Sequence, residues 1–171
     1  DKKTVDLYKP KSYLFEDQKD FSSQTKDIDI SPYSTPAVNQ FSMFYSIMKS
    51  NLLKKEYEIK NDFKYDCVIR CRFDLIPGEI FKAEKYDLNM LNVKGDCIHT
   101  SYCINDHFCI SNSNNMDVYS DTYNFLEQYY YNDKEPFCPE VLLGYGLTYD
   151  QNRKLKIKKY NWNNSIRYVY R

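Results

Sequence analysis

The stretch YDCVIRCRFD, residues 65–74, carries the most informative strand pattern in the chain. Because successive side chains of a strand point to opposite faces, Arg70, Arg72 and Asp74 are expected to share one face. Charge therefore gathers toward the carboxyl end of this strand. The pattern predicts a strand that delivers two guanidinium groups and one carboxylate to the edge of a sheet.

Helical and strand patterns alternate on both sides of this segment. Apolar residues recur at helical spacing over residues 36–58, where Lys54 and Glu58 fall on the polar side. A second helical face is expected over residues 116–130, and Pro139 introduces a third helix that ends near residue 149. Further strands are expected at residues 4–8, 12–16, 97–102, 106–111, 154–160 and 165–170, with a short helix or strand at 86–93. Because helices and strands interleave, the sequence predicts an α/β fold.

Length and composition limit the functions that the chain can have. Its 171 residues suffice for one domain, residues 1–171, with a sizeable core. The 24 basic and 24 acidic residues cancel, which removes the electrostatic basis for a nucleic-acid partner. The sequence contains no apolar stretch of the roughly 18 to 20 residues that an integral membrane segment requires.

The six cysteines are expected to be reduced and mostly buried, as in a cytosolic protein. Cys67 and Cys71 lie in an apolar run, while Cys97, Cys103 and Cys109 lie in segments that resemble strands. The chain has no CxxC motif and only two histidines, so its sequence gives little support for a structural zinc site.

Arg70, Arg72 and Asp74 form the strongest candidate site. Ligands of open α/β sheets bind beyond the carboxyl ends of the strands. There Asp74 could bind a divalent cation and the two arginines could bind phosphate. The same residues could instead form an ion-pair network that ties the strand end to a loop.

Asp106 and Glu140 are the other candidates for chemistry. Asp106 precedes an apolar strand and could bind a hydroxyl or a metal, act as a base, or simply stabilise a turn. Glu140 lies in the first turn of a helix, where it could act as a base, contact an acceptor sugar, or interact with the helix dipole. His99 and His107 could ligate a metal from neighbouring strands, although no third ligand is spaced to complete that site.

Four segments, SMFYSIMKSN (42–51), FKYDCVIRCRFDL (63–75), NDHFCISNSNNMDVYS (105–120) and PEVLLGYGL (139–147), occur in an order that is similar to one family. They resemble glycosyltransferases of large DNA viruses and bacterial surface-polysaccharide clusters. The resemblance implies a Rossmann-like GT-A domain with a central, mostly parallel sheet flanked by helices. It also implies transfer of a sugar from a nucleotide-diphosphate donor to a glycan hydroxyl, in the cytoplasm, or the host cytoplasm for a viral protein.

By the same resemblance, Asp74 takes the place of a DxD-type element that binds Mn²⁺ or Mg²⁺, and Arg70 and Arg72 support the diphosphate. Asp106 or Glu140 would then position or deprotonate the acceptor. Arg72 stands where a true DxD has its first aspartate, and the first strand and helix of the family have no counterpart here. The chain is therefore expected to be a partial domain, with a non-catalytic carbohydrate- or protein-binding relative as the alternative. A metal-dependent hydrolase using Asp74, Asp106 and a histidine is a further class.

Overall fold

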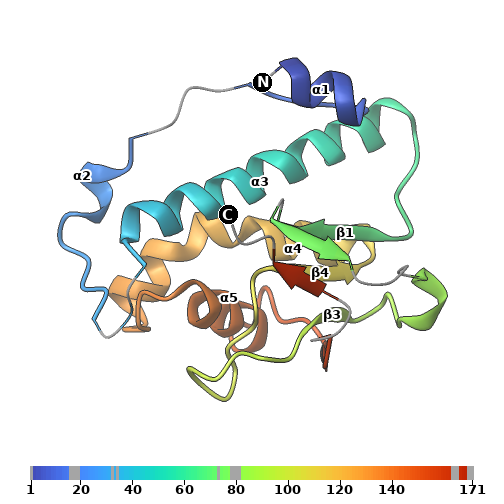
Figure 1. Ribbon diagram of the computed structural model, residues 1–171. Helices are drawn as coiled ribbons and strands as arrows, with labels where there is room; N and C mark the ends of the chain where they lie inside the picture. The colour runs from blue at the N-terminus through green and yellow to red at the C-terminus, as the bar shows by residue number, and fades with distance from the viewer. Residues whose placement is uncertain are drawn as a thin grey trace.

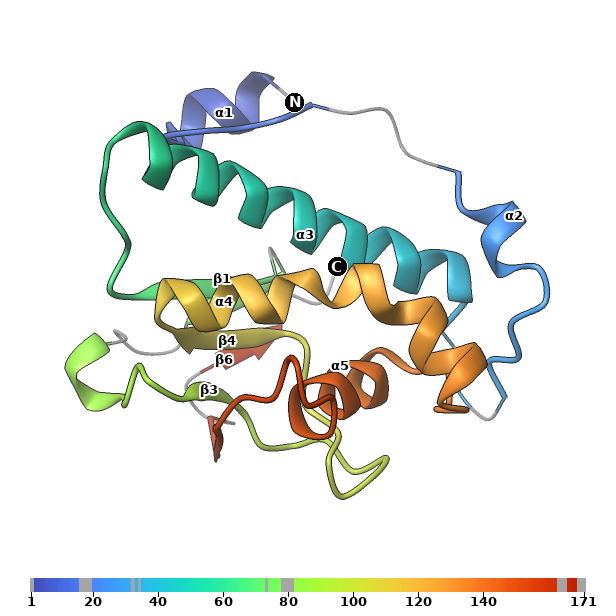
Figure 2. The ribbon, with the colours of Figure 1, turned by 180° about the vertical axis from the view of Figure 1, so that it is seen from behind.

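The computed structural model describes residues 2–15, 20–31, 33, 35–72, 74–77, 82–162 and 166–168. Its centre is a mixed four-stranded sheet with helices packed against it (Figures 1 and 2). The strands follow the order β1 (Val68–Cys71), β4 (Phe108–Ser111), β3 (Leu91–Lys94) and β5 (Ile157–Tyr160). The α/β class expected from the sequence is thus confirmed.

The sheet differs from expectation in the direction of its strands. β4 pairs antiparallel with both β1 and β3, and the β3–β5 pair is parallel. The expectation of a mostly parallel sheet is wrong for these strands, because a parallel neighbour requires a long crossover. Residues 95–107 return from β3 to β4 without a helix, whereas the chain between β4 and β5 includes helical segments at residues 113–120, 121–125, 128–132 and 139–148.

Three of the expected strands have another structure. Residues 2–8 form the helix α1 (Lys2–Tyr8), while residues 12–15 and 97–102 are irregular, and residue 16 lies outside the described residues. The apolar side chains of these segments are largely exposed, for example Leu7 at 74% and Ile98 at 89%, so they do not contribute to a buried sheet. Of the expected strand at 165–170, residues 166–168 form β6 (Ile166–Tyr168), which pairs antiparallel with β2 (Leu75–Pro77). Residues 165, 169 and 170 lie outside the described residues.

Three helices agree with the sequence patterns, although the α-helix expected over residues 116–130 ends at residue 120 and continues as 3₁₀ and π segments. α3 (Ala37–Lys60) begins after Pro36, and α4 (Ser113–Ser120) begins after Asn112, whose side chain accepts a hydrogen bond from the backbone of Asn115. α5 (Pro139–Thr148) starts with its proline in the first turn, a position where the missing N–H costs nothing. The remaining helical segments are α2 (Ser22–Thr25), the 3₁₀ segments η1 (Ala83–Lys85) and η2 (Asp121–Phe125), and the π-helical η3 (Gln128–Asn132).

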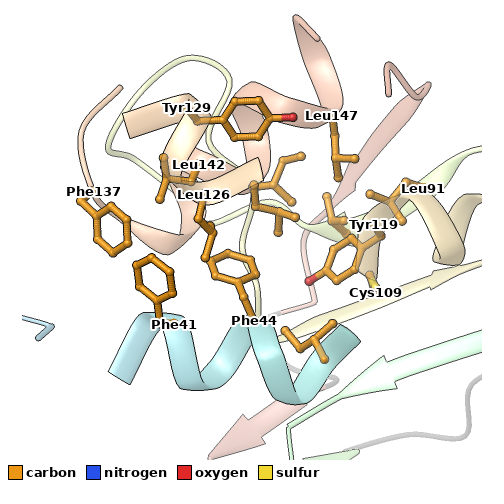
Figure 3. Close-up of a cluster of buried hydrophobic side chains, with 14 of the residues drawn as sticks. Phe41, Phe44, Leu91, Cys109, Tyr119, Leu126, Tyr129, Phe137, Leu142 and Leu147 are labelled. Atoms are coloured by element: carbon orange, nitrogen blue, oxygen red, sulfur yellow. The ribbon is translucent and has the colours of Figure 1, made fainter. Parts of the chain in front are cut away.

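The main core lies between the helices and one face of the sheet. Figure 2 shows α4 in front of β1 and β4, and Figure 1 shows it behind them. Phe41 and Phe44 of α3 point toward Leu126 and Leu142, as Figure 3 shows. These side chains are essentially inaccessible to water, so their burial is a major source of stability.

The opposite face of the sheet is covered by aromatic rings. Trp162 stacks on Tyr160 with ring centroids 5.3 Å apart and meets the edge of Phe108 at 4.9 Å. Phe108 and Ile110 therefore pack on this face, while Cys109 packs in the main core. Because β4 is buried on both faces, it holds the residues immediately before it, including Asp106, in a fixed position.

Glu58 of α3 is a buried carboxylate, although the helical pattern placed it on the polar side. It is 1% exposed, and its oxygens contact the Lys54 Nζ at 3.2 Å and the backbone nitrogen of Tyr65 at 2.9 Å. Burial alone would raise the pKa of Glu58, but hydrogen bonds from Ser113, Tyr65 and Lys54 outweigh it and lower the pKa from 4.5 to about 2. The ionised carboxylate is therefore part of the folded state.

This arrangement predicts an acid-dependent loss of stability. Because the pKa of Glu58 is lower in the folded than in the unfolded chain, its contribution is complete above pH 4.5 and disappears as the pH falls to about 2. Replacing it by glutamine is expected to cost about 3 kcal/mol at pH 7, since Lys54 loses a buried partner. Urea unfolding between pH 2 and pH 7 should show a shallower pH dependence for Glu58→Gln than for the wild type. Glu56→Gln, at an exposed position of the same helix, is the matched control, and parallel curves for all three proteins would refute the assignment.

Candidate metal centre

Residues 104–107 are held between the sheet and α5 by backbone hydrogen bonds. The backbone nitrogen of Ile104 donates to the carbonyl of Glu140 at 2.9 Å, and that of Arg72 donates to the carbonyl of His107 at 3.1 Å. The side chain of Asn105 accepts a hydrogen bond from the backbone of His107 at 2.9 Å. These contacts bring the start of β4 beside the first turn of α5.

Asp106, His107 and Glu140 converge at this junction. Their potential ligand atoms all lie within 4.8 Å of one another, and the Asp106 Oδ1 is 3.3 Å from the His107 Nε2. Asp106 is 3% exposed, whereas Glu140 is only partly buried, so the cluster reaches from the interior to the surface. Glu140 is thus a third potential ligand beside Asp106 and His107. His99, which the sequence paired with His107, belongs to a different group of potential ligands.

Burial is the largest influence on the pKa values of Asp106 and His107. Burial raises the pKa of Asp106, against the opposing attraction of His107 and Arg70. Burial also lowers the pKa of His107; the carboxylates of Asp106 and Glu140 oppose this effect, and the positive charges of Arg72 and Arg70 add to it. A neutral imidazole beside two carboxyl groups is the form of histidine that binds metal ions.

Arg70 links this cluster to a neighbouring cleft of about 650 Å³ between α3, β1 and α4. It lies in β1 opposite Cys109 of β4, and its charge acts on Asp106. Its Nη1 is buried and has no hydrogen-bond partner among the described residues. Buried donors are almost always paired, and an anionic oxygen such as that of a phosphate is a suitable partner for a guanidinium group.

Arg72 and Asp74 form a two-point ion pair at the edge of the same cleft. The Arg72 Nε lies 3.0 Å from the Asp74 Oδ1, and the Nη2 lies 2.7 Å from the Oδ2. The hydrogen bonds from Arg72 lower the pKa of Asp74. Both carboxylate oxygens therefore bind Arg72, and within the described part of the chain Asp74 does not belong to the groups of potential metal ligands. This is the ion pair that the sequence left open as the simpler interpretation.

The expectation that all six cysteines are reduced is wrong, because Cys97 and Cys103 form a disulfide. The segment between them turns instead of forming the expected strand, which brings the two Cα atoms to 5.9 Å. The other four cysteines are free thiols, of which Cys109 and Cys138 are buried as expected, while Cys71 is exposed.

Sequence reasoning missed the role of two residues in this region. The sequence pairs His107 with His99, or combines a histidine with Asp106 and Asp74, but it does not indicate that Glu140 lies beside Asp106 and His107. Cys138, whose Sγ donates to the Glu140 Oε2 at 3.2 Å, was not singled out at all. The sequence did contain one signal for Cys138, because it lies two residues before Glu140 at the start of an expected helix.

Comparison with models of known protein families, with curated proteins and with solved structures finds no match for this chain. None of the helices in the described residues is both long enough and apolar enough to cross a membrane.

Proposed function

We propose that this chain is a metal-assisted glycosyltransferase, which moves a sugar from a nucleotide-diphosphate donor to a glycan hydroxyl. The observation that carries the proposal is the convergence of Asp106, His107 and Glu140 beside Arg70. Asp106 and Glu140 are candidates for chemistry from two separate sequence segments, so their meeting in space supports a shared site. The family resemblance supplies the reaction class.

The three clustered side chains suit a divalent cation, and we propose that they hold it in place of Asp74. One imidazole and two carboxylates match Mn²⁺ better than Mg²⁺, which prefers oxygen ligands and retains several waters. When bound, such an ion neutralises the charge that develops on a diphosphate leaving group.

The remaining roles follow from exposure and charge. Arg70 would bind the diphosphate through its unpaired Nη1, and Asp74 would act as a positioning residue that orients Arg72 at the edge of the cleft. Glu140 is the more exposed carboxylate of the cluster, so an acceptor hydroxyl can reach it and transfer its proton to it. Asp106, which is buried, would act as a ligand and not as a base.

Nucleotide binding gives the first test of this proposal. With Mn²⁺ present, one nucleoside diphosphate among UDP, GDP and CDP is expected to raise the melting temperature by about 5 °C at 100 times its Kd. Arg70→Gln should abolish this shift, because the diphosphate loses its buried partner. Lys60→Gln, which removes an equal charge from the exposed end of α3, should preserve it. No shift in the wild type, or an equal shift in Arg70→Gln, would contradict the assignment.

A binding-only relative is the second candidate, favoured by the burial of Asp106 and by the ion pair that engages Asp74. As a carbohydrate- or protein-binding relative, it would show no thermal shift with any nucleoside diphosphate and would not release one from a nucleotide sugar. A metal-dependent hydrolase would instead cleave simple phosphoesters. The cytoplasmic location is a further prediction, against which the Cys97–Cys103 disulfide weighs, because disulfides are rare in reducing compartments.

A further inference from the structure

We propose that His99, Cys138 and Glu140 form a second metal site, suited to a thiophilic divalent cation such as Zn²⁺. Their potential ligand atoms all lie within 4.8 Å of one another, and the Cys138 Sγ is 3.2 Å from the Glu140 Oε2. This site does not depend on sugar transfer. It shares only Glu140 with the Asp106–His107–Glu140 cluster.

The ligand chemistry differs between the two groups. Cysteine sulfur, imidazole nitrogen and carboxylate oxygen are the three ligand types that zinc uses in proteins, and three protein ligands leave a position open for water or substrate. The Asp106–His107–Glu140 cluster contains no sulfur, so a thiophilic ion prefers the group that contains Cys138. Glu140 belongs to both groups and could therefore contact both ions.

The surrounding structure holds the three ligands in place. Cys138 precedes α5 and is 2% exposed, and it packs with Cys103 and Val141 in a small core. His99 lies in the loop that the Cys97–Cys103 disulfide closes, and the Lys159 Nζ donates to the Cys103 carbonyl at 2.9 Å. The disulfide thus anchors the loop that carries His99 next to the start of α5.

The edge of the site is open to solvent. His99 is exposed, and the ring of Tyr33 meets it edge-on at a centroid distance of 5.1 Å. A metal ion can therefore reach the imidazole from outside, while the thiol lies on the inner side. Metal binding would displace the proton of the Cys138 thiol, which is currently donated to Glu140.

Titration with Co²⁺, a spectroscopic substitute for Zn²⁺, tests the proposal. The wild type should develop a thiolate-to-cobalt charge-transfer band that saturates at one ion per chain and disappears when Zn²⁺ is added. Cys138→Ser should abolish the band, and Cys71→Ser, which removes the exposed thiol, should retain it. His99→Ala should weaken Co²⁺ binding by about tenfold or more, at an exposed position where the fold is not at risk.

Three outcomes would overturn the second site: no band in the wild type, a band that persists in Cys138→Ser, or unchanged affinity in His99→Ala. The result is separable from the proposed function, because His107→Gln removes a ligand only from the sulfur-free cluster. That variant should keep the band while losing the stabilisation by Mn²⁺ and nucleotide. If the wild type shows the cobalt band but no nucleotide stabilises it, the glycosyltransferase proposal is refuted and the second metal site is not.

Discussion

Glu140→Gln is expected to weaken Mn²⁺ binding by about 100-fold and to reduce sugar transfer by about 1,000-fold. The substitution removes the negative charge that faces Asp106 and His107 while keeping the size of the side chain. Folding should be preserved, because the Glu140 contact that anchors residue 104 is made by its backbone carbonyl. Isothermal titration with Mn²⁺ and a coupled assay of diphosphate release measure the two effects.

Asp74→Asn is the informative control for this variant. Both oxygens of Asp74 already bind Arg72, so its loss should leave the Kd for Mn²⁺ within about twofold of the wild type. A modest rise in the KM for the donor is expected, since Arg72 would be less well oriented. If Asp74→Asn lost Mn²⁺ binding and Glu140→Gln retained it, the metal would belong to the end of β1, as the family resemblance implies.

Gly144→Ala is expected to cause the largest loss of stability. A Cβ at this position would lie 2.2 Å from the Tyr102 carbonyl oxygen and 2.9 Å from the Cys103 Cα. Both are backbone atoms in a segment fixed by the disulfide and by Lys159, so they cannot move aside. The gain in helix propensity, about 1 kcal/mol, is too small to compensate. We expect a loss of about 4 kcal/mol and a fall of about 10 °C in melting temperature, measured by circular dichroism.

Gly146→Ala, in the same helix, separates backbone clash from helix propensity. A Cβ there would approach side-chain atoms of Tyr129 and Arg153 at 2.6 to 2.7 Å. Side chains can adjust more easily than backbone, so its loss of stability should be clearly smaller than that of Gly144→Ala. Equal melting temperatures for Gly144→Ala and the wild type would show that α5 does not pack against residues 102–103 as described.

The helices α3, α4 and α5 could be predicted because their signals are local, whereas α1 replaces an expected strand. The apolar spacing that defines α3, the Asn112 cap of α4 and the proline of α5 each act within a few residues. The direction of the strands could not be predicted in this way. Whether β3 pairs parallel with β5 depends on how residues far apart in sequence meet, and a strand pattern contains no information about its partner.

Individual residues of the candidate site could be predicted from the sequence, but their proximity in space could not. Asp106 and Glu140 stood out because of their positions at the start of a strand and the start of a helix. Their convergence depends on the contact between Ile104 and Glu140, which no spacing in the sequence indicates. The pairing of Arg72 with Asp74 could be foreseen as one of two alternatives, since the two residues share a strand face.

The central claim is that Asp106, His107 and Glu140 bind the cation. The most direct measurement is the anomalous difference density of a crystal grown with Mn²⁺ and a nucleoside diphosphate. We predict a peak within coordination distance of all three side chains, with the diphosphate reaching Arg70. A peak on Asp74 instead, or no peak at a concentration of Mn²⁺ that stabilises the protein, would contradict the account.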